Sequence, residues 1–187
     1  MQSLKDKYKK EVISAMMQKL GYKNPMAVPV IKKVVLNSSF GKAVAGKSAS
    51  EREKIQNIIM QDLSLIAGQK AILVKSRKSI AGFKLREGLE IAAVVTLRKR
   101  RMWDFLERFI YLSLPRSRDF KGIDPKSIDK NGNLSVGFKE HISFPEIFTE
   151  KEKTIFGLEI TIATTAKSKE EGLELYKLLG FPMKEIK

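Results

Sequence analysis

The sequence predicts an α+β fold, in which helices pack on one face of a mostly antiparallel five-stranded sheet and the other face stays polar and open. Two observations predict it. Four segments carry apolar residues at helical spacing, and five segments between them alternate apolar and polar residues. A sheet buried on both faces would instead show continuous apolar strands. The chain has no internal repeat, so it is not a solenoid or a propeller.

The four helices are predicted from apolar stripes and from signals at their ends. The stripes lie over residues 4–20, 55–66, 102–110 and 168–179. Gly21 and Gly68 end the first two, since glycine readily adopts the left-handed conformation that follows a helix. Pro115 closes the third. The fourth begins at Ser168, where Glu171 completes a capping box.

The five strands are predicted over residues 30–38, 69–76, 90–98, 133–139 and 158–166. The residues expected to face the core are Val34 and Leu36, Ile72 and Val74, Val95 and Leu97, Leu134 and Phe138, and Ile160 and Ile162. The opposite, polar set is Lys33 and Asn37, Gln69 and Lys75, Thr96 and Arg98, Ser135 and Lys139, and Thr161 and Thr165. A polar, basic sheet face of this kind is a platform for RNA in other α+β modules.

Composition predicts one globular domain over residues 1–187, since 43% of the residues are apolar and 30% are charged. No apolar run approaches the roughly 20 residues of a membrane span. The N-terminal segment lacks the apolar core of a signal peptide. The absence of cysteine excludes disulfides and thiolate metal sites, which is typical of a cytoplasmic protein.

The charge of the chain is concentrated in residues 70–101. Ten residues there are Lys or Arg and two are Glu, so this stretch carries +8 of the net charge of +15. Such a concentration indicates a polyanionic partner, because neutralised phosphates release condensed counterions. An anionic membrane surface would also attract it, so charge alone leaves both partners open. We expect protruding loops near residues 76–90 and 115–133, which are basic and turn-rich respectively.

Residues 41–48, GKAVAGKS, match the phosphate-binding pattern G-x-x-x-x-G-K-[ST] from Gly41 to Ser48. Two features argue against a P-loop. The preceding strand alternates polar and apolar residues, whereas a P-loop strand is normally covered on both faces. No apolar strand ends in the aspartate that would hold magnesium. A small P-loop NTPase is therefore kept as the alternative function.

The sequence contains no catalytic constellation. His141 is the only histidine, and neither a carboxylate cluster nor a nucleophile surrounds it. We therefore predict a loop or strand-edge histidine, no metal, no cofactor and no enzymatic activity. Phe83, between Gly82 and Lys84, has no periodic partner and would either anchor the basic loop or stack on a nucleotide.

Several long blocks of the chain resemble one family. They include LKDKYKKEVISAMMQKLGYKNP, GQKAILVKSRKSIAGFKLREG, AAVVTLR, LPRSRDFKGIDPKSIDKNGN, FKEHISFPEI and GLEITIATTAKSKEEGLELYKLLGFP. In this order they are similar to bacterial large-subunit ribosomal protein five over nearly the whole chain. The resemblance implies a structural protein of the ribosome's central protuberance, located in the cytoplasm. It implies binding to 5S rRNA, contacts with 23S rRNA and the peptidyl-site tRNA, and a bridge to a small-subunit ribosomal protein.

The resemblance also implies site residues. Positions matching the family's 5S-binding residues are Asn37 in VVLN, Gln69 in GQK and Thr96 in VTLR, and we add Lys33 and Arg98 from the same predicted face. The loop matching the family's tRNA-facing segment contributes Lys75, Arg77, Lys78, Ser79, Phe83, Lys84 and Arg86. The loop after LPRSRDFKG is expected to face the subunit interface.

Two stretches depart from the family pattern. LNSSFGKAV stands where LNMGVGEAV is usual, and a longer insert, AGKSASEREK, follows it. The apparent P-loop lies within this variable stretch. A basic run from Arg98 to Arg101 also replaces the family's usual glycine after VTLR, which suggests either added phosphate contacts or only a more basic helix start.

Overall fold

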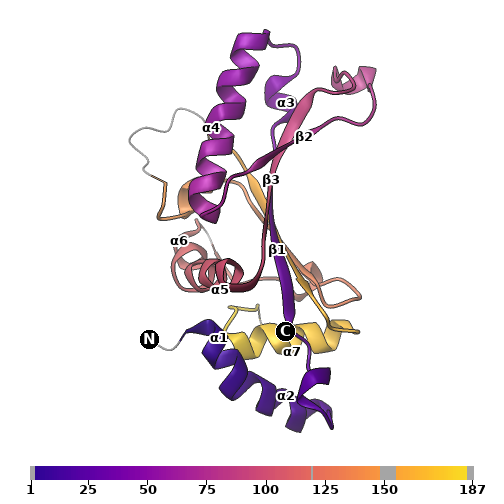
Figure 1. Ribbon diagram of the computed structural model, residues 1–187, viewed down its shortest axis with the longest axis vertical. Coiled ribbons are helices and arrows are strands. Elements are labelled where there is room, and N and C mark those ends of the chain that lie inside the picture. Colours follow the sequence, from indigo (N-terminus) through magenta and orange to yellow (C-terminus); the bar gives the residue numbers. More distant parts are fainter. Residues whose placement is uncertain (1–2, 119, 148–154, 185–187) are drawn as a thin grey trace. The chain divides into compact units, whose positions relative to one another are not determined.

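The computed structural model describes residues 3–118, 120–147 and 155–184 (Figure 1). Its strands are β1 (Ile31–Ser39), β2 (Ile72–Lys75), β3 (Glu90–Leu97), β4 (Leu134–Phe138) and β5 (Leu158–Thr164). Its α-helices are α1 (Leu4–Lys7), α2 (Ile13–Leu20), α3 (Gly41–Val44), α4 (Ala49–Ala67), α5 (Lys99–Arg108), α6 (Leu114–Arg116) and α7 (Lys169–Leu179). Two π-helical turns, η1 (Tyr8–Val12) and η4 (Phe109–Ser113), join α1 to α2 and α5 to α6. Short 3-10 helices are η2 (Pro25–Ala27), η3 (Ala81–Phe83), η5 (Pro125–Ser127) and η6 (His141–Ser143).

The five strands form one antiparallel sheet in the order β2-β3-β1-β5-β4. The predicted α+β class is therefore confirmed. Alternation is also confirmed on four strands, where the residues expected in the core are buried, among them Leu36, Val95, Leu134 and Ile160. None of the described helices is long and apolar enough to cross a membrane.

The chain divides into two compact units. Unit 1 comprises Met1–Val34, Arg98–Val136 and Thr161–Lys187, and unit 2 comprises Val35–Leu97 and Gly137–Ile160. A compact unit within one chain is not by itself an independent domain. The expectation of one domain over residues 1–187 stays a prediction.

Unit 1 is built around the aromatic core of its helices. The rings of Phe105 and Phe109 stack at 5.8 Å, and Tyr176 and Phe181 meet edge-on at 5.2 Å. Trp103, which lies off the apolar stripe of α5, is also buried, and its ring lies 5.6 Å from that of Tyr8 on η1. The contact of Tyr8 with Trp103 packs η1 against α5.

Helix ends in unit 1 differ from the predictions at two places. Pro115 does not end its helix, which continues to Arg116. The wider π turn η4 directly precedes α6, so Pro115 lies in the first turn of α6, where a proline is tolerated. Ser168 caps α7 by accepting a hydrogen bond from the Glu171 amide, as expected. The Glu171 carboxylate, however, accepts from the Lys167 amide at 2.8 Å, so the capping box is incomplete.

In unit 2, α4 packs against β3, and the two elements lie side by side in Figure 1. The buried residues of α4 include Ile59, Leu63 and Ile66, and those of β3 include Ala93 and Val95. The helix ends at Gly68 as predicted, with that glycine in the left-handed conformation at φ 64°. It begins at Ala49, however, six residues before the apolar stripe.

The predicted orientation of β2 is wrong. Ile72 and Val74 are 71% and 41% exposed instead of buried. The register pairs Leu73 with the buried Ala93, so Leu73 faces α4, and its neighbours on the strand point to the opposite side. Residues 71–74 are all apolar, and a continuous apolar run carries no alternation from which the buried face can be read.

Candidate nucleic-acid interface

The residues predicted to bind 5S rRNA in unit 2 come from three neighbouring elements. Asn37 and Thr96 are half-buried on β1 and β3, which are adjacent in the sheet. Gln69 does not lie on a strand but in the bend after α4, and its side-chain amide donates a hydrogen bond to the main-chain oxygen of Thr96 at 3.4 Å. The structure therefore brings Gln69 and Thr96 together, because the side chain of Gln69 binds the backbone of Thr96.

The other two predicted residues belong to unit 1. Lys33 is half-buried on β1, and Arg98 is exposed directly before α5. The backbone of Arg98 is extended, at φ −140° and ψ 163°, and its side chain does not cap the helix. The basic run that follows enters α5, where Lys99, Arg100 and Arg101 are all exposed.

The exposed side of β2 is apolar. Ile72 pairs with Val94 of β3, and Val74 pairs with Ala92. Directly opposed residues of an antiparallel pair point to the same side of the sheet, so these four side chains form one surface next to Thr96 on β3. The open face therefore carries Asn37 of β1 and Thr96 of β3 as polar groups, but it is apolar over β2 and the part of β3 that pairs with it.

The basic loop between β2 and β3 is held by its own hydrogen bonds. At its base, the Ser76 amide donates to Leu89 O at 2.7 Å and the Gly88 amide donates to Ser76 O at 3.0 Å. Nearer the tip, Ile80 and Leu85 exchange backbone hydrogen bonds of 3.0 and 3.2 Å. The loop is thus a preorganised structure, which lowers the entropy lost on binding.

The side chains predicted to bind along this loop project into solvent. Exposed residues are Lys75, Arg77, Lys78, Ser79, Phe83, Lys84 and Arg86. Phe83 is 63% exposed, so it does not anchor the loop in the core, and an exposed aromatic ring is suited to stacking on a base. The Ser79 hydroxyl accepts a hydrogen bond from the Glu87 amide at 2.9 Å. Lys84 adopts the left-handed conformation at φ 52°, which is unusual for a residue with a side chain.

Residues 41–48 do not form a P-loop. A P-loop cradles phosphates with free backbone amides, whereas here the amides of Ala43, Val44 and Lys47 donate to main-chain carbonyl oxygens within residues 40–44. Ser48 begins α4 as the N-cap of a full capping box. Its hydroxyl donates to the Glu51 carboxylate at 2.7 Å and its amide donates to the same oxygen at 3.1 Å.

The hydroxyl and amide of Ser48 are therefore bound to the Glu51 carboxylate instead of being free for a phosphate. The hydrogen bond from the Ser48 hydroxyl, with that from the Ser48 amide, lowers the pKa of Glu51. The motif that suggested nucleotide hydrolysis is thus the start of an ordinary helix.

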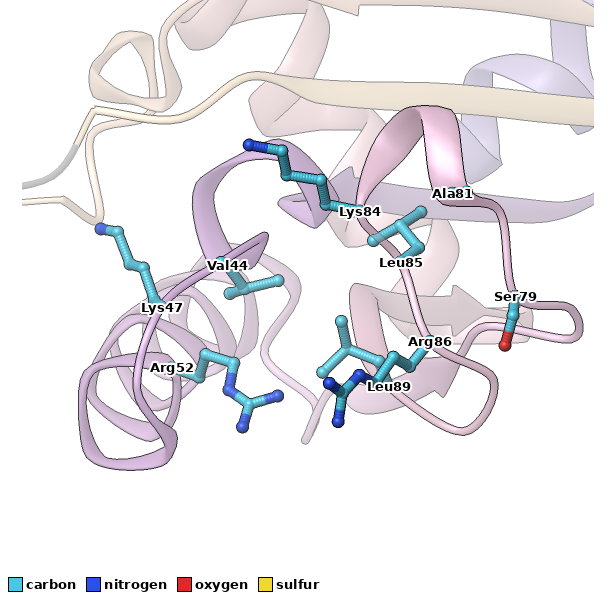
Figure 2. Close-up of a pocket in the computed structure, with 10 residues that line it drawn as sticks. Val44, Lys47, Arg52, Ser79, Ala81, Lys84, Leu85, Arg86 and Leu89 are labelled. Atoms are coloured by element: carbon cyan, nitrogen blue, oxygen red, sulfur yellow. The ribbon is translucent and has the colours of Figure 1, made fainter.

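The basic loop also lines a pocket in unit 2, which sequence reasoning missed (Figure 2). One wall comes from the end of α3, the residues after it and the start of α4, and the other comes from residues 79–89 of the loop. Its four cationic residues are Lys47, Arg52, Lys84 and Arg86. The only signal in the sequence was the high density of basic residues in both segments.

The prediction for His141 is only partly right. The residue lies in η6, outside the strands, but its side chain is fully buried, with the ring stacked on Phe156 at 3.9 Å. Its Nε2 lies 3.9 Å from the Asp62 carboxylate, and its Nδ1 accepts a hydrogen bond from the Phe156 amide at 3.4 Å. Within residues 3–118, 120–147 and 155–184, no group of three or more His, Cys, Asp or Glu could hold a metal ion.

The loop near residues 115–133 is ordered by Asp129. Its carboxylate accepts hydrogen bonds from the amides of Asn131 and Asn133 at 2.9 and 2.8 Å. Ile123 pairs with Met183 in an isolated parallel bridge. These contacts tie the loop to the rest of unit 1.

Two family models match successive parts of the chain. The model of ribosomal protein L5 matches residues 24–86, and the model of the C-terminus of the same ribosomal protein family matches residues 90–183. The first match ends at Arg86 and the second begins at the first residue of β3, so the basic loop lies at their junction.

Curated relatives are similar over almost their full length. The large ribosomal subunit protein uL5 of Dictyoglomus turgidum is 51% identical over 185 residues, which cover 99% of this chain and 100% of the relative. The uL5 protein of Desulforapulum autotrophicum is 47% identical over 184 residues, which cover 98% of this chain and 99% of the relative. The uL5 protein of Francisella tularensis subsp. novicida is 49% identical over 184 residues, which cover 98% of this chain and 99% of the relative. The chain therefore belongs to the ribosomal protein L5 family.

Proposed function

We propose that this chain is a structural protein of the large ribosomal subunit whose polar sheet face binds 5S rRNA and whose basic loop contacts the peptidyl-site tRNA. The observation that carries the proposal is the separation of two surfaces in unit 2. Asn37 and Thr96 are half-buried on adjacent strands, whereas the loop residues are exposed cations on a self-bonded projection. Family membership supports the ribosomal assignment and location in the cytoplasm.

The mechanism is positional. Half-buried polar groups on a rigid sheet have few rotamers and offer directional hydrogen bonds, which suits recognition of one RNA shape. Exposed Lys and Arg side chains supply affinity through phosphate contacts, without reading the sequence. In this proposal the sheet face, together with Lys33 and Arg98, selects 5S rRNA, and the loop adds contacts to a second RNA.

Further contacts complete the proposal. We assign the remaining basic surface to 23S rRNA and the loop over residues 115–133 to the bridge with a small-subunit ribosomal protein. The protein acts without enzymatic activity in this role. The P-loop NTPase alternative loses its support, because the amides and the serine of residues 41–48 are engaged in α3 and in the cap of α4.

The decisive experiment is recovery of the tagged protein from cells after the ribosomes have been dissociated in EDTA. Co-purification of an RNA the size of 5S rRNA supports the proposal. Recovery of other RNAs in proportion to their abundance would overturn the selective role of the sheet face. Lys47→Ala tests the alternative, since a P-loop NTPase would bind ATP and would lose that binding in the variant.

A further inference from the structure

The pocket in unit 2 contains cations from segments that are distant in the chain. Lys47 lies between α3 and α4 and Arg52 lies in the first turn of α4, while Lys84 and Arg86 lie on the basic loop. Figure 2 shows the guanidinium groups of Arg52 and Arg86 pointing toward each other across the pocket, while the side chains of Lys47 and Lys84 point away from that pair. The volume of the pocket is about 720 Å³, more than a single phosphate group fills.

Among the described residues, no carboxylate forms a salt bridge with any of the four cations. Glu51, in the first turn of α4, accepts hydrogen bonds from the Ser48 amide and hydroxyl, and it interacts electrostatically with Lys47 alone among the four. Two guanidinium groups that face each other repel, and an anion between them removes the repulsion and gains hydrogen bonds from both.

The rest of the lining determines what kind of anion fits. Val44, Leu85 and Leu89 form apolar walls, which lower the local dielectric and strengthen attraction for an anion. None of the described residues that line the pocket is aromatic, so a base would find no stacking partner among them. Arginine forks match phosphate oxygens in a bidentate way. The lining therefore suits phosphate and provides no aromatic ring for a nucleobase.

From this geometry we propose that the pocket binds phosphates of an RNA backbone, and that the bound strand bridges the basic loop to the start of α4. The proposal deepens the function proposed above and rests on its contact between the basic loop and RNA. It assigns Lys47 and Arg52, which lie outside the loop, to the same RNA contact.

Lysine footprinting tests the assignment directly. The full-length protein is acetylated at low reagent excess, alone or with tRNA, 5S rRNA, ATP or inorganic pyrophosphate, and each lysine is quantified by mass spectrometry. We expect at least one RNA to protect Lys47 and Lys84 several-fold. Lys42 and Lys54, exposed on α3 and α4 but outside the pocket, serve as matched controls and keep their reactivity.

The other outcomes separate the two proposals. Protection of Lys78 and Lys84 without Lys47 would overturn the pocket assignment and leave the loop contact standing. Protection of Lys47 with neither Lys78 nor Lys84 would overturn the proposed loop contact and the bridge together. Protection of Lys47 by micromolar ATP or pyrophosphate but by neither RNA would make the pocket a site for free phosphates and overturn the RNA assignment.

Substitutions provide a second, independent measurement. Arg52→Ala should weaken binding of the protecting RNA about tenfold and reduce the slope of log affinity against log salt by about one, while Lys54→Ala should do neither. Arg52→Lys should restore the salt slope but only part of the affinity, because lysine lacks the bidentate fork. If Arg52→Ala and Lys54→Ala change the RNA affinity and the salt slope equally, the proposal that the pocket is a defined RNA site is overturned.

Discussion

The side-chain amide of Gln69 donates a hydrogen bond to the main-chain oxygen of Thr96 at 3.4 Å, which ties the bend after α4 to β3. The family resemblance assigns both Gln69 and Thr96 to RNA recognition, and this hydrogen bond shows that Gln69 also holds the backbone at Thr96. Replacing Gln69 would disturb the bend as well as any RNA contact. Asn37, on the adjacent strand β1, is the cleaner test of recognition by the sheet face.

Asn37→Ala should lower affinity for 5S rRNA about fivefold, since a lost hydrogen bond is worth about 1 kcal/mol. Affinity for an unrelated RNA of equal length should stay the same, because phosphate contacts are not sequence-specific. Competition binding at fixed salt measures both. Asn57→Ala, at an exposed position on α4, is the matched control and should change neither value.

Lys78→Ala should weaken binding to every RNA that contacts the basic loop and reduce the salt slope by about one, because one phosphate contact is lost. Titrations from about 50 to 200 mM salt measure the slope. Lys169→Ala, the control, removes another exposed charge, on α7 in unit 1. If it flattens the slope as much as Lys78→Ala, the loop holds no special role.

Ser48→Ala should reduce the free energy of unfolding by about 1 kcal/mol through loss of the α4 cap. It should also raise the pKa of Glu51, which the hydrogen bonds from Ser48 hold below its ordinary value. A lowered carboxyl pKa stabilises the fold above the ordinary glutamate pKa, and that contribution disappears as the pH falls through the lowered value. NMR titration of Glu51 and urea unfolding measure both effects. Ser50→Ala, two residues further along the chain, should leave the Glu51 pKa at its lowered value.

Gly172→Ala should destabilise the protein by about 1–3 kcal/mol, as overpacking does. A Cβ at this position would lie 2.6 Å from Gly132 Cα and 2.7 Å from Gly132 O, where α7 meets the turn before β4. Gly137→Ala is the control, since nothing lies within 4 Å of its added Cβ. Equal thermal stability of the two variants would contradict the close approach of Gly172 to Gly132.

Ile72→Ala should cost less than about 1 kcal/mol of stability, whereas Ile59→Ala should cost about 2–5 kcal/mol. Both residues are isoleucines of unit 2, but Ile72 is 71% exposed and Ile59 is 1% exposed. Urea unfolding compares them. A larger loss of stability for Ile72→Ala than for Ile59→Ala would contradict the exposed position of Ile72 and favour the buried orientation predicted from the sequence.

The sequence by itself determined the class of the fold, the strands and most of the buried face. Where apolar and polar residues alternate, as around Asn37 on β1 and Thr96 on β3, only one orientation buries the apolar side chains, so the face follows from the pattern. Gly21 and Gly68 end their helices because the left-handed conformation suits a residue without a side chain. Such local preferences need no knowledge of distant neighbours.

Tertiary structure decided the features that depend on a partner distant in the chain. The buried face of β2 followed from its pairing with β3, because an all-apolar strand fits either orientation. Residues 41–48 matched a P-loop as a string, but hydrogen bonding made them a short helix and a cap. The pocket arises because folding brings Arg52 opposite Arg86. The spacing of residues along the chain does not reveal how close two separate segments lie in space.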